Sequence, residues 1–145
     1  MIDFGRIRDL ARQEERLRWA VERQMAKCTR ITPTISDMPK GGGSGQRMEE
    51  DVIRLALLKE QHEAVAGELR GERKTLAPYI RRLRDGTQRT AMTLRYMENK
   101  RIGVIMEAMG YSERQVFRIL EKAESKILQR EIVKEGQKKD GSTCQ

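Results

Sequence analysis

The strongest constraint on the fold is a sharp break at Gly110, which separates two stretches with helical apolar spacing. Three apolar residues before the break recur at spacings of three and four, as on one face of a short helix: Ile102, Ile105 and Met109. Glycine adopts positive φ without steric cost, so Gly110 suits a tight corner between two helices. The residues from Ser112 to Gln115 then have the S-x-x-Q form of a capping box, which satisfies free amides at a helix start. Residues 94–128 therefore predict a helix, a second short helix, a tight turn and a longer third helix.

The predicted third helix carries apolar and basic residues on different sides. Helical geometry, about 100° per residue, gathers the candidate core residues on one side: Val116, Ile119, Leu120, Ala123 and Ile127. Cations follow at intervals of four on the other side: Arg114, Arg118, Lys122, Lys126 and Arg130. A short apolar helix, a glycine turn, a cap and a basic outer face in this order are typical of a helix-turn-helix. We therefore predict that this part of the chain binds double-stranded DNA.

The candidate DNA-binding residues divide by their place on these helices. In a helix-turn-helix, the second helix enters the major groove with its N-terminal residues towards the base edges. Arg114, Gln115 and Arg118 follow the cap at Ser112 and are therefore predicted to read bases. Residues farther along the helix, or in the bend before the short helix, are predicted to contact phosphates: Lys100, Arg101, Lys122 and Lys126. The alternative for any basic helix is a solvated charged face.

A Pro- and Gly-rich loop at residues 32–45 separates two long amphipathic helices in the first half of the chain. The first, at residues 4–31, has a heptad pattern with these apolar positions: Ile7, Leu10, Leu17, Val21, Cys28 and Ile31. The second begins at residue 47 and has a pattern of its own: Met48, Val52, Leu55, Ala66, Leu69, Leu76, Ile80 and Leu83. Polar residues interrupt the two patterns, among them Glu14, Gln24 and His62. We interpret His62 as a register-setting or boundary residue and not as a ligand or base.

These patterns predict an all-α protein with a long antiparallel helical hairpin followed by a small helix-turn-helix domain. The hairpin is assigned to residues 1–77 and the helix-turn-helix domain to residues 78–130, because Pro78 should kink or restart the second long helix. Residues 131–145 lose the apolar period and are predicted to be a disordered basic tail. Three apolar residues off the hairpin seam predict a homo-oligomer or docking onto the C-terminal domain: Trp19, Ile53 and Leu57.

Composition limits the classes of function. Of the 145 residues, 4% are aromatic and 36% are charged, which favours helices over a thick globular core. The formal net charge of +8 favours a polyanionic partner. No long apolar window and no secretion signal is found, so we expect a cytoplasmic protein without a membrane partner. Cys28 and Cys144 lie far apart, and no paired carboxylates or activated nucleophile stand out, so no metal, cofactor or enzyme activity is expected.

Residues 94–127 resemble region 4 of sigma-70 type RNA polymerase sigma factors, through LRY at 94–96, GYS at 110–112 and the pair Phe117-Arg118. With an S-x-M-P-x-G-G-G-type loop, here residues 36–43, the chain is similar to phage-encoded sigma-70 region-4-like transcriptional regulators of Gram-positive bacteria and their prophages. The resemblance implies a helix-turn-helix that regulates transcription of phage or prophage genes. It also implies host RNA polymerase as a second partner.

Two other functions remain open. A phage small terminase subunit also joins a helix-turn-helix to long oligomerising helices, although such proteins usually carry the DNA-binding part first. A module that binds RNA polymerase without touching DNA would use the same C-terminal domain. A footprint on promoter DNA, with and without polymerase, separates DNA binding from polymerase binding.

Overall fold

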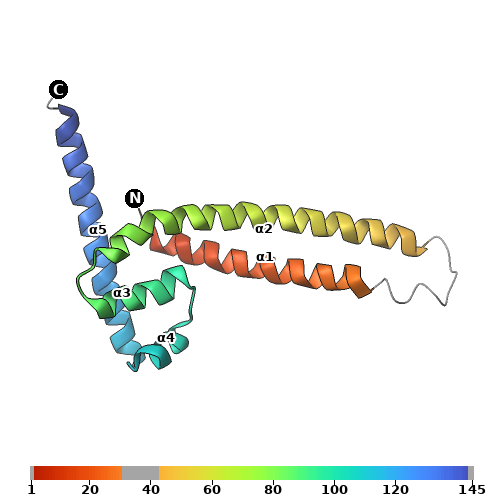
Figure 1. Ribbon diagram of the computed structural model, residues 1–145, viewed down its shortest axis with the longest axis horizontal. Helices are drawn as coiled ribbons and strands as arrows, with labels where there is room; N and C mark the ends of the chain where they lie inside the picture. Colours follow the sequence, from red (N-terminus) through yellow and green to blue (C-terminus); the bar gives the residue numbers. More distant parts are fainter. Residues whose placement is uncertain (1, 31–42, 144–145) are drawn as a thin grey trace. The chain divides into compact units, whose positions relative to one another are not determined.

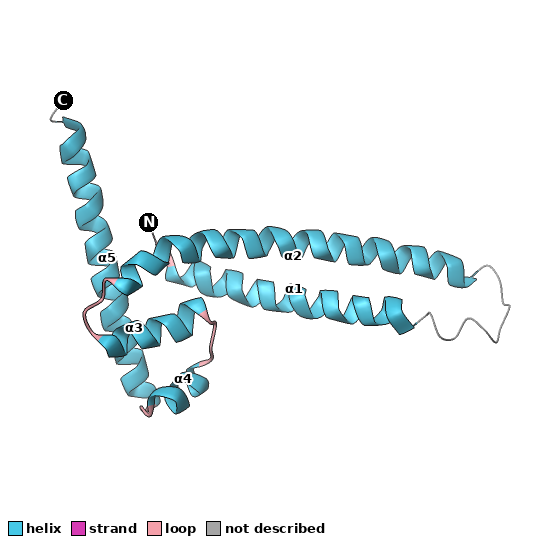
Figure 2. Cartoon of the chain, viewed as in Figure 1, coloured by secondary structure: helices cyan, strands magenta, loops and turns pink. Residues whose placement is uncertain are grey.

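The computed structural model describes residues 2–30 and 43–143, and within these ranges all regular structure is helical (Figure 2). The predicted all-α class is therefore confirmed. The elements in chain order are α1 (Phe4–Arg30), α2 (Gly43–Arg81), α3 (Gly86–Met92), the π-helix η1 (Thr93–Met97), α4 (Ile102–Met109) and α5 (Glu113–Thr143) (Figure 1). None of these helices is long and apolar enough to cross a membrane.

The predicted loop at residues 32–45 lies mostly outside the described residues. Its last part differs from the prediction, because α2 already begins at Gly43. A helix that is formed from residue 47 onwards extends backwards at small cost, since each added residue gains a hydrogen bond, and even glycine lowers helix stability by only ~1 kcal/mol.

The chain forms two compact units, and their boundary differs from the predicted one at residue 77. One unit combines Met1–Arg8 with Arg70–Gln145, and the other is Asp9–Leu69. The start of the chain belongs with the C-terminal helices because its groups find their partners there. The Ile2 amide donates to both carboxylate oxygens of Glu131, at 2.8 and 3.0 Å. The Phe4 ring lies 5.1 Å from the Tyr96 ring, centroid to centroid.

Pro78 was predicted to kink or restart the second long helix, and the structure shows no restart there. Helix α2 continues through Pro78 to Arg81. Proline removes one amide donor from a helix, but Pro78 lies in the last turn, where the Arg82 amide still donates to the Pro78 carbonyl at 3.2 Å. The chain then restarts at Asp85, whose carboxylate accepts from the Thr87 amide at 2.9 Å and caps α3.

In place of the predicted disordered tail at residues 131–145, the structure has a helix over most of this range. The backbone stays helical to Thr143, and residues 144 and 145 lie outside the described part. The tail is rich in Glu, Lys and Gln, which favour helix without any apolar period. Its first residue, Glu131, is also buried, with 7% of its surface exposed, and is fixed by the Ile2 amide.

In the unit Asp9–Leu69, the polar residues that interrupt the two heptad patterns contact one another. The His62 ring lies 3.1 Å from the Glu14 carboxylate. The buried Gln24 amide donates to the Asp51 carbonyl at 3.0 Å and to its carboxylate at 3.2 Å. Because the earlier residue of α1 pairs with the later residue of α2, the two helices run antiparallel within this unit, side by side in Figure 1. The interruptions therefore set the pairing of the helices.

Several apolar side chains of this unit face solvent. Trp19, Ile53 and Leu57, which lie off the predicted seam, are 59%, 59% and 55% exposed. Val52 was predicted to lie in the seam, and it is exposed as well. Next to Val52, Asp51 accepts hydrogen bonds from the buried Gln24, so a polar contact joins the two helices at this level.

Candidate nucleic-acid interface

The turn between α4 and α5 has the geometry that the sequence predicted. Gly110 adopts a left-handed conformation, with φ 71° and ψ 30°. The amides of Gly110 and Tyr111 both donate to the Met106 carbonyl, at 2.8 and 3.3 Å. The bond from Gly110 is that of an αL cap, and the bond from Tyr111 is the longer bond of a Schellman motif. The tight corner therefore depends on a backbone conformation that glycine adopts without strain.

The capping box at the start of α5 is also present. The Gln115 amide donates to the Ser112 hydroxyl oxygen at 3.4 Å, and the Ser112 amide donates to the Gln115 side-chain oxygen at 3.0 Å. The Ser112 hydroxyl is 3.2 Å from the same oxygen. This arrangement fixes the first turn of α5, but it engages the Gln115 oxygen within the chain. Of the three predicted base-reading residues, Arg114 and Arg118 are therefore better placed than Gln115.

The two sides of α5 divide as the apolar spacing predicted. Four of its candidate core residues are buried: Val116, Leu120, Ala123 and Ile127. The fifth, Ile119, is half-buried. They pack with α3 and α4, whose buried residues include Ala91, Met92 and Ile105. Because this core holds the apolar side of α5, its opposite side carries the exposed side chains of Arg114, Arg118 and Lys122.

The ladder of cations along α5 is not continuous, because its last two members turn towards the chain itself. A spacing of four residues drifts round a helix by about 40°, so Lys126 lies about 120° from Arg114. The Lys126 ammonium donates to the buried side chain of Gln88 at 3.3 Å, and Arg130 donates to the Arg82 carbonyl at 2.7 Å. Lys126 therefore has an intramolecular role that the sequence did not indicate.

Lys100 and Arg101 lie in a defined bend before α4. Asn99 has a positive φ of 53°, and the Lys100 amide donates to the Leu94 carbonyl at 2.8 Å. Arg101 is extended, with φ −72° and ψ 154°, and is the N-cap residue of α4. Both cationic side chains are exposed. The bend therefore presents two positive charges at the start of the first helix of the pair.

Tyr96 connects the π-helix to α5. Its side chain is 2% exposed, its hydroxyl donates to the Glu124 carboxylate, and its carbonyl accepts from Arg73 at 2.9 Å. Burial raises the pKa of the Tyr96 hydroxyl well above its ordinary value, and the hydrogen bond to Glu124 and the charge of Glu124 raise it further. The sequence did not indicate this polar contact, because Tyr96 and Glu124 are far apart along the chain.

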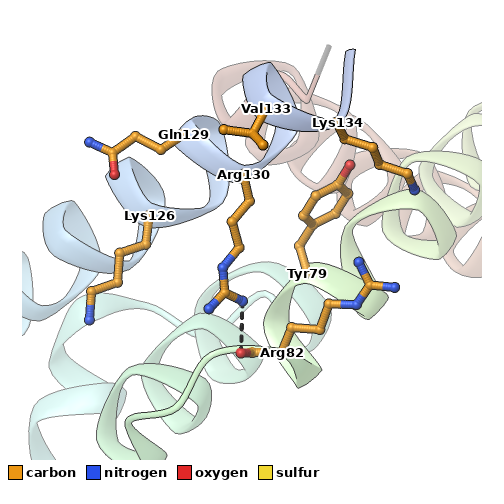
Figure 3. Close-up of a pocket in the computed structure, with 7 residues that line it drawn as sticks. All are labelled: Tyr79, Arg82, Lys126, Gln129, Arg130, Val133 and Lys134. Atoms are coloured by element: carbon orange, nitrogen blue, oxygen red, sulfur yellow. Dashed lines mark hydrogen bonds between the residues drawn. The ribbon is translucent and has the colours of Figure 1, made fainter. Parts of the chain in front are cut away.

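A second group of cations surrounds a cavity of about 610 Å³ between the end of α2 and α5 (Figure 3). We call it the basic pocket, and its lining residues are Tyr79, Arg82, Lys126, Gln129, Arg130, Val133 and Lys134. Sequence analysis missed it because Tyr79 and Arg82 are far from the α5 cations along the chain. The signal that could have indicated it is the drift of the cationic ladder round α5.

Comparison with known proteins gives one family. A family model described as a protein of unknown function (DUF1492) matches residues 31–128, more than half of the chain. No curated protein matches the chain. No solved structure matches it either.

Proposed function

This chain belongs to the DUF1492 family, and we propose that it is a sequence-specific DNA-binding regulator of transcription that reads duplex DNA with α5. The observation that carries the proposal is the first part of α5. A left-handed glycine turn and a capping box fix its start, Val116 and Leu120 hold it in the core, and Arg114 and Arg118 are exposed opposite them. Two guanidinium groups on one capped helix start suit recognition of base edges in the major groove.

Each exposed cation has a role in this proposal. The guanidinium groups of Arg114 and Arg118 would each donate two hydrogen bonds to the O6 and N7 atoms of a guanine. Lys122 lies farther along the same exposed side and would contact a phosphate. Lys100 and Arg101, in the bend before α4, would contact the backbone at the flank of the site.

Two further features support the finer parts of the proposal. The resemblance to phage-encoded sigma-70 region-4-like regulators favours phage or prophage genes as the target. The exposed Trp19, Ile53 and Leu57 in the unit Asp9–Leu69 favour a homo-oligomer formed through the N-terminal helices. Two copies would present two reading helices, which suits an operator with two half-sites.

One observation favours a second candidate function, a module that binds RNA polymerase without touching DNA. Three apolar side chains near the α4–α5 turn are 46%, 37% and 43% exposed: Val104, Tyr111 and Phe117. Exposed aromatic residues beside arginines are common at protein interfaces. The same surface could therefore contact a protein.

The deciding experiment selects bound sequences from random duplex DNA and then measures binding of variants to the selected site. Arg114→Ala and Arg118→Ala should each cost about 1–3 kcal/mol and relax base preference at one position. Lys122→Ala should weaken all sequences alike and reduce the salt slope by about one. Arg16→Ala is the matched control, because Arg16 is an exposed arginine of the other unit and should change neither quantity.

The polymerase-binding alternative gives a different result. If no sequence is enriched above a non-specific control and both arginine variants bind DNA as the unchanged chain does, the groove-reading proposal is wrong. Capture of purified RNA polymerase by the unchanged chain, lost in Phe117→Ala, would then favour the protein-binding module.

A further inference from the structure

The basic pocket gathers four cationic side chains without a counter-charge of its own. Arg82, Lys126, Arg130 and Lys134 line it, and no carboxylate is among the described residues that do so. Four positive charges around one cavity repel one another, and this repulsion is relieved when an anion enters. The remaining lining residues add an aromatic ring, an amide and a small apolar surface: Tyr79, Gln129 and Val133.

Two of the cations have contacts within the pocket, and a third has none among the described residues. One Arg130 nitrogen is fixed by its 2.7 Å bond to the Arg82 carbonyl, which leaves the rest of the guanidinium to the pocket (Figure 3). The Lys134 ammonium lies 5.9 Å from the centre of the Tyr79 ring. The Arg82 guanidinium has no hydrogen-bond or ion-pair partner in the described part of the chain. Figure 3 shows Tyr79 between Arg130 and Lys134.

The chemistry of these groups suits phosphate. A guanidinium donates two parallel hydrogen bonds to phosphate oxygens, and an ammonium adds a compact charge. Two guanidiniums and an ammonium around one cavity offer more donors than a single carboxylate can accept. They match an anion that carries two or more phosphate groups.

The pocket is far from the part of α5 that we propose for base reading. Arg130 lies sixteen residues beyond Arg114, which is about 24 Å along a helix that rises 1.5 Å per residue. Arg130 is therefore several helical turns away from the residues that we propose read bases. The cavity of about 610 Å³ is instead of the size that small molecules occupy, about 300–1,000 Å³.

We propose that the basic pocket binds a small phosphorylated molecule, with Arg82, Arg130 and Lys134 as its phosphate-binding groups. This inference goes beyond the proposed DNA-binding function and does not depend on it. Lys126 lies at the edge of the site, where its ammonium is already engaged with Gln88.

The test is calorimetric titration of the full chain with inorganic pyrophosphate at constant ionic strength. Arg82→Ala and Lys134→Ala each remove a cation, and the Arg82 change keeps the backbone carbonyl that holds Arg130. Each variant should bind pyrophosphate at least about tenfold more weakly, the factor that corresponds to ~1.4 kcal/mol. Arg81→Ala is the matched control, because Arg81 is an exposed neighbour that does not line the pocket.

Three results would overturn the proposal. The first is no heat of binding for the unchanged chain at millimolar pyrophosphate, with correct folding shown by circular dichroism. The second is equal weakening by Arg81→Ala, which would mean that only the general surface charge attracts the anion. The third is a lack of pyrophosphate binding together with weaker binding of selected duplex DNA, and a lower salt slope, in Arg82→Ala and Lys134→Ala. That result would mean that the pocket holds the DNA backbone and not a small molecule.

Discussion

Replacing Tyr96 by Phe tests how the π-helix is connected to α5. The ring keeps its buried place, and only the hydroxyl that donates to the Glu124 carboxylate is lost. A hydrogen bond to a charged group contributes about 1.5–3 kcal/mol. Glu124 is only half-buried, so water replaces part of the lost bond. At neutral pH we therefore expect Tyr96→Phe to lower the free energy of unfolding by about 1–2 kcal/mol.

The same substitution should change how stability depends on pH. The pKa of Tyr96 is raised in the folded chain, first by burial and then by Glu124, whereas an unfolded tyrosine has a pKa of about 10. Above pH ~10 the unfolded state therefore binds fewer protons than the folded state, and stability falls by up to ~1.4 kcal/mol per pH unit. The Tyr96→Phe variant has no hydroxyl to titrate at this position, so its stability lacks this fall above pH ~10. The advantage of the unchanged chain should thus disappear about one pH unit above 10.

The assay is denaturant unfolding followed by circular dichroism at neutral pH and at steps above pH 10. Tyr111→Phe is the matched control, because Tyr111 is exposed and its hydroxyl has no partner among the described residues. The free energy of unfolding of Tyr111→Phe should stay within about 0.5 kcal/mol of that of the unchanged chain. The reasoning is refuted if Tyr96→Phe is as stable as the unchanged chain at neutral pH, or if the difference between them does not shrink above pH 10.

Three further substitutions have expected effects on stability. Gly110→Ala should lower the free energy of unfolding by about 1–2 kcal/mol in thermal or denaturant unfolding, because Gly110 has φ 71°. Gly110→Asn should lower it less, and equal effects of the two substitutions would contradict a conformational cause. Ile105→Ala removes a fully buried side chain of α4 and should cost about 2–5 kcal/mol in denaturant unfolding, and a loss below 1 kcal/mol would argue against the packing of α4 on α5. Gln24→Leu leaves Asp51 without its amide donor and should cost about 1–2 kcal/mol, measured by unfolding followed through Trp19 fluorescence; unchanged stability would show that this pair does not hold α1 to α2.

Local patterns in the sequence predicted the parts of the fold that depend on neighbouring residues. Gly110 and the Ser112 capping box are determined within a few residues, and the buried stripe of α5 follows from helical spacing. Contacts between distant residues were not predictable in this way. The bond from Ile2 to Glu131 joins groups 129 residues apart, and nothing near Glu131 distinguishes it from the other acidic residues of α5.

The candidate site shows the same limit. Exposure of Arg114 and Arg118 follows from their angle to the apolar stripe. The engagement of Lys126 with Gln88 depends on where α3 packs, which a periodic pattern does not specify. Gln115 is different, because the capping box already uses its side-chain oxygen. The prediction gave the same side chain two roles, in the cap and in base reading.

The bond between Ile2 and Glu131 has a consequence for synthesis of the chain. The unit that contains both residues is built from two segments, and the whole of Asp9–Leu69 is made between them. A ribosome that adds about 5–20 residues per second reaches Glu131 roughly 6–26 seconds after Ile2. Both helical segments of the Asp9–Leu69 unit are completed before Glu131 is made, so for the rest of that interval the Ile2 amide lacks its Glu131 partner. We therefore expect the Asp9–Leu69 unit to be able to form before Ile2 is bound to Glu131.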